Sequence, residues 1–205
     1  MITLRAWAFI DKLQPQLASF IGTLSRGFLP LPEQASLHVE VSPGMAVNQA
    51  LDIALKATEA VPGMLVVERS FGLLEIHHHN HSEVLAAGKA ILDFYQISEK
   101  ERIKPRVISD QTIRSITSYH SQLLNKIRFG SMIVPGESLF ILETEPAGYI
   151  AVAANEAEKA ADVKLVDLKS VGAFGRLYMS GNEAMIDSAR SAALACIQGM
   201  TGKSI

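Results

Sequence analysis

The chain has 205 residues, of which 48% are hydrophobic and 20% are charged, and its formal net charge at pH 7 is −2. This length fits one large domain or two domains of about 100 residues, each able to build its own core. The slightly acidic balance argues against a general nucleic-acid-binding or anionic-membrane surface, because such surfaces need an excess of basic residues. The mean hydropathy of +0.20 is high for a chain with this charge content, so we expect apolar surface in subunit contacts as well as in cores.

The cysteine content and the lengths of the apolar segments further limit the class of protein. The single cysteine, Cys196, cannot form a disulfide within the chain. No apolar run reaches the roughly 18 residues that a membrane span needs. Asp11 and Lys12 interrupt the apolar N-terminal segment, so we expect no signal peptide and a cytoplasmic protein.

The first hundred residues predict alternating strands and helices. Ser42 and Pro43 favour a helix start, because Ser can cap a helix and Pro is tolerated at its first position. That helix should run to about Glu59. The expected elements are a strand over 4–10, a helix over 13–24, a Gly- and Pro-rich loop, a strand over 37–41, the helix from 42, two strands around residues 65–75, and a last helix with Val84, Leu85, Gly88, Ile91, Leu92 and Tyr95 on one face.

The stretch from Leu65 to Glu75 reads LVVERSFGLLE and places an acid beside a base between two apolar runs. Gly72 favours a turn, so Glu68, Arg69 and Ser70 should lie in a loop between two strands. A solvated turn is the simplest explanation for a single such pair. An internal repeat in the sequence makes a functional role of this loop a stronger hypothesis.

The chain matches itself at a constant shift of 103 residues, which lays Lys159 on Lys56. Aligned prolines and glycines include Pro135 on Pro32 and Gly175 on Gly72. A constant register of such residues indicates two related domains. We place them at 1–101 and 102–205, with the boundary between 98 and 104. The second copy predicts a weaker helix over 112–126, where the sequence is polar, and a last helix over 183–199. The fold class is therefore α+β, two tandem ferredoxin-like domains, each a small antiparallel sheet with packed helices.

The repeated runs LHVEVSPGMAVNQALDIALKATEAVPGMLVVERSFGLLEIH and LFILETEPAGYIAVAANEAEKAADVKLVDLKSVGAFGRLYMSG carry a resemblance to a known family. Their order of strand, helix with a late Lys, strand, loop and strand resembles the shell domain of bacterial microcompartments. The segment before residue 37 in each copy resembles the part that closes an ordinary shell domain, moved to the front. The chain is thus similar to the circularly permuted, tandem-domain shell proteins of carboxysomes and related compartments.

This resemblance implies a structural shell protein in the bacterial cytoplasm. It implies a homotrimer with six similar domains around one axis, and two such trimers can stack. The trimer would pack beside other shell proteins. Small metabolites would pass through a gated central pore. The pore positions are Glu68, Arg69 and Ser70 in one copy and the small, uncharged Val171 and Gly172 in the other. No catalytic residue, cofactor, nucleic acid or membrane partner is implied.

In such shells each flat trimer is one tile of the shell. The resemblance also assigns Lys56 and Lys159 to the edge where neighbouring tiles pack. Asp52 and Asn155, one helical turn earlier, are placed to orient them. Without the resemblance, an ordinary solvated lysine on a helix would be the simplest interpretation.

The sequence offers only weak evidence for a metal site, a reactive cysteine, a phosphate loop or a pair of catalytic acids. His77, His78, His79 and His81 suggest a metal site, but consecutive strand residues cannot all face one ion, so surface imidazoles are expected. Cys196 lies on an Ala-rich helix and is expected to be a core residue. The run 171–175 lacks the Lys and following helix of a phosphate loop, and Glu156 and Glu158 are two apart on a helix and do not converge.

One rival function remains open from the sequence. The two repeats can instead form a small-molecule-binding regulatory or enzymatic protein, with the charged loop as its ligand site. The oligomeric state separates this alternative from a shell protein.

Overall fold

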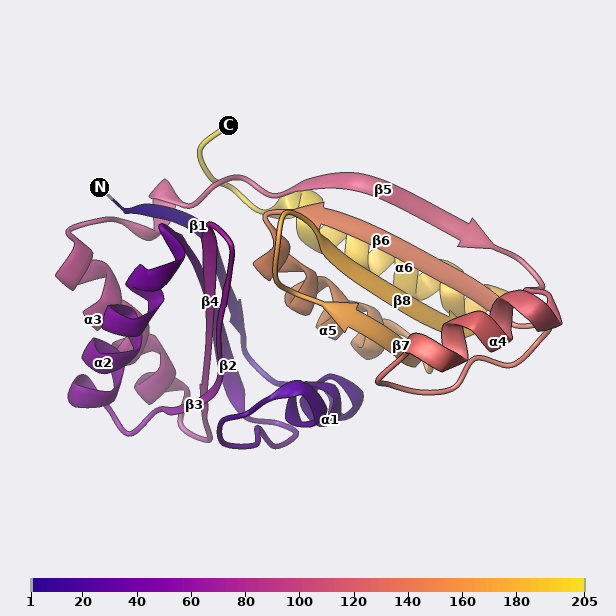
Figure 1. Cartoon of the computed structure of the whole chain (residues 1–205), viewed down its shortest axis with the longest axis horizontal. Helices are drawn as coiled ribbons and strands as arrows, with labels where there is room; N and C mark the ends of the chain where they lie inside the picture. Colours follow the sequence, from indigo (N-terminus) through magenta and orange to yellow (C-terminus); the bar gives the residue numbers. More distant parts are fainter. Residues whose placement is uncertain (1, 205) are drawn as a thin grey trace.

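The computed structural model describes residues 2–204 and contains two four-stranded antiparallel sheets, one in each half of the chain (Figure 1). We call residues 1–101 the first repeat and residues 102–205 the second repeat. The strand orders are β1-β2-β4-β3 and β5-β6-β8-β7, so the two sheets share one topology. The predicted α+β fold of two tandem units with packed helices is confirmed.

The two repeats have the same order of elements. The first contains β1 (Thr3–Ile10), α1 (Pro15–Leu24), β2 (Ala35–Ser42), η1 (Gly44–Ala46), α2 (Val47–Ala57), β3 (Val61–Glu68), β4 (Phe71–His78), α3 (His81–Tyr95) and η2 (Glu99–Glu101). The second contains β5 (Arg106–Ile113), α4 (Ser118–Ile127), β6 (Ser138–Glu145), η3 (Ala147–Tyr149), α5 (Ile150–Ala160), β7 (Lys164–Lys169), β8 (Gly175–Gly181) and α6 (Glu183–Gly199).

The helix expected from Ser42 begins later than predicted. Ser42 is the last residue of β2 and pairs with Thr3 of β1. The 3-10 turn η1 follows, and α2 begins at Val47 without a side-chain cap and ends at Ala57. The capping role expected of Ser42 was therefore wrong, because strand pairing outweighs the local preference of a Ser-Pro pair.

Two further helix predictions need correction. The helix expected over 112–126 is α4, which starts only at Ser118 because Thr112 still pairs with Phe140 in the second sheet. The predicted apolar face of α3 holds for Val84 and Ile91, which are buried, but Leu85 is 54% exposed. Leu85 lies on the solvent side of α3 because it directly follows Val84, which points into the core.

The first sheet is covered on both faces (Figure 1). Helices α2 and α3 cover one face, where Val39 and Leu74 are buried. On the other face, the core continues from Ala6 and Ala8 of β1 into α5 of the second repeat. One core cluster therefore contains residues of both repeats and packs them against each other.

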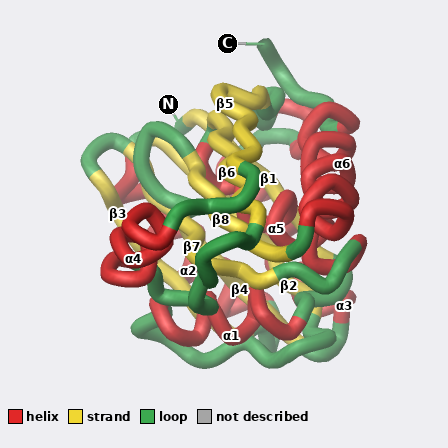
Figure 2. The backbone as a smooth tube through the Cα atoms, turned by 90° about the vertical axis from the view of Figure 1, so that its right-hand side faces the viewer, coloured by secondary structure: helices red, strands yellow, loops and turns green. Residues whose placement is uncertain are grey.

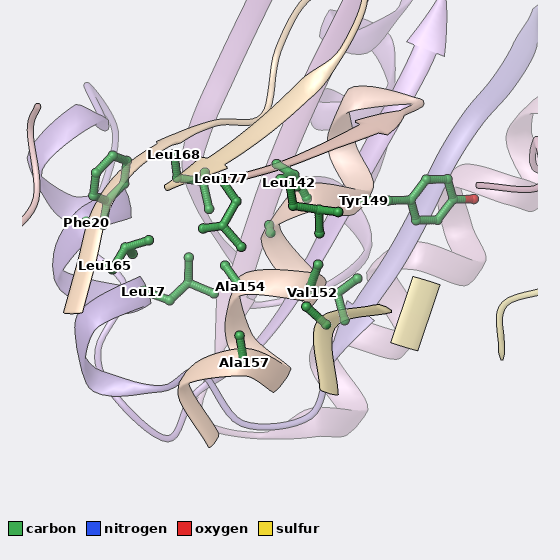
Figure 3. Packing of buried hydrophobic residues seen from close by; sticks show 14 of the residues in the cluster. Leu17, Phe20, Leu142, Tyr149, Val152, Ala154, Ala157, Leu165, Leu168 and Leu177 are labelled. Atoms are coloured by element: carbon green, nitrogen blue, oxygen red, sulfur yellow. The ribbon is translucent and has the colours of Figure 1, made fainter. Parts of the chain in front are cut away.

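Helix α1 lies at the contact between the repeats. Figure 3 shows Leu17 and Phe20 of α1 beside Leu165 of β7, with Ala157 of α5 below. These residues are at most 3% exposed. Burial of such side chains contributes about 1.5–3 kcal/mol for each large residue, so this contact holds α1 against the second repeat.

The second sheet is covered less completely. Helices α5 and α6 pack on one side, and α4 lies on the opposite side (Figure 2). Only a small cluster around Ile116 and Ile133 is buried near α4. The outer side of α4 exposes Tyr119, Leu123 and Ile127, so an apolar surface remains at this end of the molecule.

The segment between the repeats is held in place. The Tyr149 hydroxyl donates to the carbonyl of Ile103 at 2.9 Å, and burial raises the pKa of Tyr149 to about 12. Lys203 near the C-terminus exchanges backbone hydrogen bonds with Arg102 and Lys104. The connection is therefore an ordered part of the structure and contributes to the contact between the repeats.

Candidate functional site

The Glu68-Arg69-Ser70 segment forms the tip of the β3–β4 hairpin, as predicted. Glu68 pairs with Phe71, and Arg69 and Ser70 form the two-residue turn between them. Arg69 has a backbone φ of 53°, in the left-handed region that residues other than Gly rarely adopt. All three side chains of the segment are exposed, so they are free to face a partner or a channel.

The corresponding loop of the second repeat is wider. Strand β7 ends at Lys169 and β8 begins at Gly175, so five residues separate the strands. Gly172 has a φ of +99°, which L residues rarely adopt. Pairing in the second hairpin ends at Lys169 with Arg176, whereas pairing in the first continues to Glu68 with Phe71.

The two loops lie side by side where the sheets meet (Figure 1). A Cβ atom added to Gly172 would lie 3.2 Å from Oε1 of Glu68. The structure thus brings the charged turn together with the small, uncharged loop within one chain. Whether the loops border a pore depends on the assembly and stays a prediction.

A cavity of about 820 Å³ lies behind the loops, between β3 and β7. Glu68 and Val171 line its loop end, Phe28 and Phe129 add apolar walls, and Lys169 adds a positive charge. This cavity could not be predicted from the sequence, because it arises only where the edge strands of the two repeats approach each other.

The lysines at the predicted tile edge are exposed at the ends of equivalent helices. Lys56 donates to Oδ2 of Asp52 at 2.7 Å, the pairing that the sequence predicted. Lys159 lies 3.8 Å from a carboxylate oxygen of Glu156 instead. The edge role of both lysines stays a prediction.

Asn155 does not orient Lys159, and that prediction was wrong. Asn155 is 2% exposed. Its Oδ1 accepts the N–H of Gln14 at 2.9 Å, and its Nδ2 donates to the carbonyl of Lys12 at 3.1 Å. The side chain points into the contact between the repeats, which a single-helix argument could not locate.

Glu158 has a similar role that the sequence did not reveal. Its two carboxylate oxygens accept the N–H groups of Gln16 and Leu17 at 2.7 and 3.0 Å. These amides belong to the first turn of α1, where a carboxylate complements the helix dipole. Burial raises the pKa of Glu158, and the two hydrogen bonds oppose this change. The second repeat thus caps a helix of the first.

The histidine cluster does not lie wholly on the surface. His77 is 2% exposed, and its Nδ1 lies 3.2 Å from Oε2 of the buried Glu75. The expectation that His77 is a surface imidazole was wrong, because it lies on the same face of β4 as the buried Leu73 and Glu75. His81 pairs with Asp11 at 2.9 Å at the surface. No group of His, Cys, Asp or Glu within residues 2–204 is arranged to hold a metal ion.

The remaining expectations concern single residues. Cys196 packs against the core on α6, as predicted, and burial raises the pKa of its thiol to about 11. Glu156 and Glu158 contact different partners and do not converge. In the part of the chain that the structure describes, no helix has the length and apolar character needed to cross a bilayer.

A buried charged pair that the sequence did not reveal connects the first sheet to the second repeat. Nε of Arg5 lies 2.6 Å from Oε1 of Glu40, and both residues are at most 8% exposed. Oε2 of Glu40 accepts the N–H of Gly148 at 2.7 Å. Burial raises the pKa of Glu40, and the hydrogen bond from Arg5 opposes this change.

Comparisons with known proteins agree on one class. The family model described as "CsoS1D N-terminal domain" matches residues 4–101. The carboxysome shell protein CsoS1D of Hydrogenovibrio crunogenus is 52% identical over 205 residues, which cover both chains completely. The fused permuted hexameric shell protein MSM0275 from the RMM microcompartment is 44% identical, with a TM-score of 0.95 over 98% of this chain and 99% of that chain. The double ringed trimeric shell protein MSM0271 from the same microcompartment is 38% identical, with a TM-score of 0.97 over all of both chains.

Proposed function

The chain belongs to the family of tandem-domain, circularly permuted microcompartment shell proteins that includes carboxysome shell proteins, and we propose that it forms a trimeric shell tile with a gated central pore. As a member of this family it is a structural component of a microcompartment shell, which lies inside the bacterial cytoplasm. In the trimer, the units 1–101 and 102–205 act as six similar shell domains around one axis. The tile adjoins other shell proteins.

The observation that carries the proposal is the unequal covering of equivalent surfaces in the two repeats. Phe20 of α1 is 3% exposed beneath the second repeat, whereas its counterpart on α4, Leu123, is 62% exposed. The covering side shows the same contrast, since Gly148 is buried and its counterpart Met45 is 69% exposed. A second copy can therefore place η1 on β5 and α2 on α4, just as η3 packs on β1 and α5 packs on α1. Three chains of two repeats then close a ring of six.

The two adjacent loops supply the proposed pore. Three Glu68-Arg69-Ser70 turns would alternate with three loops carrying Val171 and Gly172, and the small loops leave room for the charged side chains to move. Three guanidinium groups about 5 Å apart would repel by roughly 3 kcal/mol per pair at an effective dielectric near 20. The closed state therefore interleaves Arg69 with carboxylates such as Glu68, and the open state turns Arg69 away from the axis.

An open pore lined by Arg69 suits small metabolites that carry phosphate or carboxylate groups, because guanidinium forms paired hydrogen bonds with both. The related MSM0271 is described as double ringed, which supports stacking of two trimers of this chain. Lys56 and Lys159 form the lateral tile contacts, so the double substitution of both by Ala should leave trimers that no longer form sheets.

The trimer is tested by measuring the mass of the chain in solution by light scattering after gel filtration. The wild type should have three or six times the chain mass of 22.2 kDa. Leu123→Glu should yield a monomer, because it places a charge in the proposed contact. Leu85→Glu is the matched control, because Leu85 is similarly exposed on α3, and it should leave the assembly intact. A monomeric or dimeric wild type would favour a small-molecule-binding regulatory or enzymatic protein instead.

A further inference from the structure

The Glu68-Arg69-Ser70 turn is closed by the pairing of Glu68 with Phe71. The guanidinium group of Arg5 lies directly beneath the ring of Phe71, with its central carbon 3.6 Å from the ring centroid. Arg5 is 8% exposed, so its charge is largely removed from water. A cation over an aromatic face is attracted by the ring quadrupole, and the attraction grows as the cation is desolvated. Phe71 is thus held from below by a buried cation.

Arg5 reaches this place through an irregularity of β1. The register between β1 and β2 shifts between Leu4 and Ala6, so Arg5 is the extra residue of a bulge. A bulge changes the direction of a side chain relative to its neighbours. Glu40 then fixes the guanidinium from one side at 2.6 Å and accepts the N–H of Gly148 from the other. The contact beneath Phe71 is therefore anchored in the junction of the two repeats.

The second repeat has the same bulge without the anchor. Its register shifts between Val107 and Ser109, which places Ile108 at the position of Arg5. Glu143, the counterpart of Glu40, pairs with Arg176 of β8 instead. The second loop thus lacks a buried cation at this position, and it is also the loop whose strands separate earlier.

We infer that Arg5 is a positioning residue that holds the base of the Glu68-Arg69-Ser70 turn through Phe71 and ties the position of the turn to the contact between the repeats. Calling the turn a pore element rests on the proposed function. The positioning itself is a property of the single chain. Arg5 thereby keeps β3 and β4 paired up to the turn, so that motion in the pore falls to the side chains of Glu68 and Arg69.

Hydrogen exchange measured by mass spectrometry on the full-length protein tests this inference. In Arg5→Met, the amides of residues 66–72 should exchange about fivefold to thirtyfold faster, the range expected from losing one cation–aromatic contact that is largely removed from water. Peptides from α6 should not change. Arg5→Lys, which keeps a cation over the ring, should restore part of the protection. A rise of equal size over β2, β4, α3 and residues 66–72, with no excess at the turn, would mean that Arg5 is merely structural and would overturn the inference.

Two further variants keep the test decisive. Arg106→Met removes an arginine from an exposed pair with Glu145 and should leave residues 66–72 unchanged. Phe71→Leu removes the ring but leaves the buried charges, so it serves if Arg5→Met fails to fold, and it should produce the same local rise. Unchanged exchange at 66–72 in the folded variants would refute the positioning role. The exchange result is independent of whether the chain assembles, so failure of the pore proposal is recognised separately by the solution mass.

Discussion

Glu40 of the first repeat accepts a hydrogen bond from the backbone N–H of Gly148 in the second repeat at 2.7 Å. In the opposite direction, Glu158 of the second repeat accepts N–H groups from the first turn of α1. Each repeat therefore places a carboxylate at the start of a helical segment of the other. This reciprocal exchange, together with the shared core, makes the two repeats a rigid pair from which a ring can be built.

The Arg5–Glu40 pair should be essential for stability. Glu40→Ala leaves the Arg5 guanidinium buried without its counter-ion, and breaking a buried pair in this way costs about 3–5 kcal/mol. Urea unfolding followed by the fluorescence of Trp7, which is buried in the first repeat, measures the change. Glu145→Ala, which breaks an exposed pair with Arg106, should cost less than about 1 kcal/mol. Equal losses in the two variants would contradict the importance of burial.

Stability should fall as the pH drops below about 6.5 because of His38. Burial lowers the pKa of His38 from its ordinary value of 6.5. The nearby charge of Glu75 opposes this decrease, and electrostatic interaction with His77 adds to it. Neither ring nitrogen of His38 has a hydrogen-bond partner among the described residues. The folded protein thus holds His38 neutral, whereas the unfolded chain binds a proton, so the stabilisation is present above pH 6.5 and is lost toward the lower folded-state pKa.

The size of the pH effect follows from linkage. Between the two pKa values the free energy of unfolding should fall by about 1.4 kcal/mol for each pH unit. Urea titrations across this range measure the slope, and His38→Leu should reduce it. If His38→Leu keeps the full slope, His38 is not the group responsible.

Gly172 should not tolerate a side chain. Gly172→Ala introduces a Cβ at a φ of +99° and 3.2 Å from Glu68, so it should destabilise the protein by about 1 kcal/mol or more. Gly136→Ala is the matched control, because Gly136 has a φ of +90° with no atom within 4 Å of the added Cβ. The excess loss for Gly172→Ala, measured by thermal unfolding, should disappear when Glu68 is also replaced by Ala. An excess that persists would mean that Glu68 does not contact this loop.

Removal of Glu68 should favour the open pore. In Glu68→Ala, the Arg69 side chains lose the neighbouring carboxylates that offset their mutual repulsion. A structure of the assembled variant by electron microscopy should then show Arg69 turned away from the axis. Arg69→Ala should be open as well, because no cation remains to block the pore. A variant trimer that stays closed by Arg69 would count against the gate.

The sequence predicted the features that depend on local pattern and on the repeat. The constant register of 103 residues indicated two equivalent sheets, and the Glu68-Arg69 pair between apolar runs indicated the hairpin tip. The hairpin signal is carried by residues close in the chain, and the repeat signal comes from comparing the two halves of the sequence. They gave the architecture and the place of the charged turn.

Several side chains whose roles sequence reasoning missed lie between the repeats. Asn155 and Glu158 look like surface residues on isolated helices, yet both accept hydrogen bonds across the contact between the two repeats. Arg5 gave no signal, because a bulge in β1 decides its direction. Such contacts depend on how two complete units pack, which hydrophobic periodicity does not describe.

The bulge occupied by Arg5 in one repeat and by Ile108 in the other has a consequence for how this kind of tile can evolve. A ring of six identical polypeptides must carry the same residue at all six equivalent positions, so every substitution is multiplied by six. Fusion of two copies into one gene removes that constraint and lets alternate positions diverge. The loop of one repeat can then become rigid while the loop of the other acquires small residues. The alternation of the two loops around a threefold axis is then encoded in a single gene.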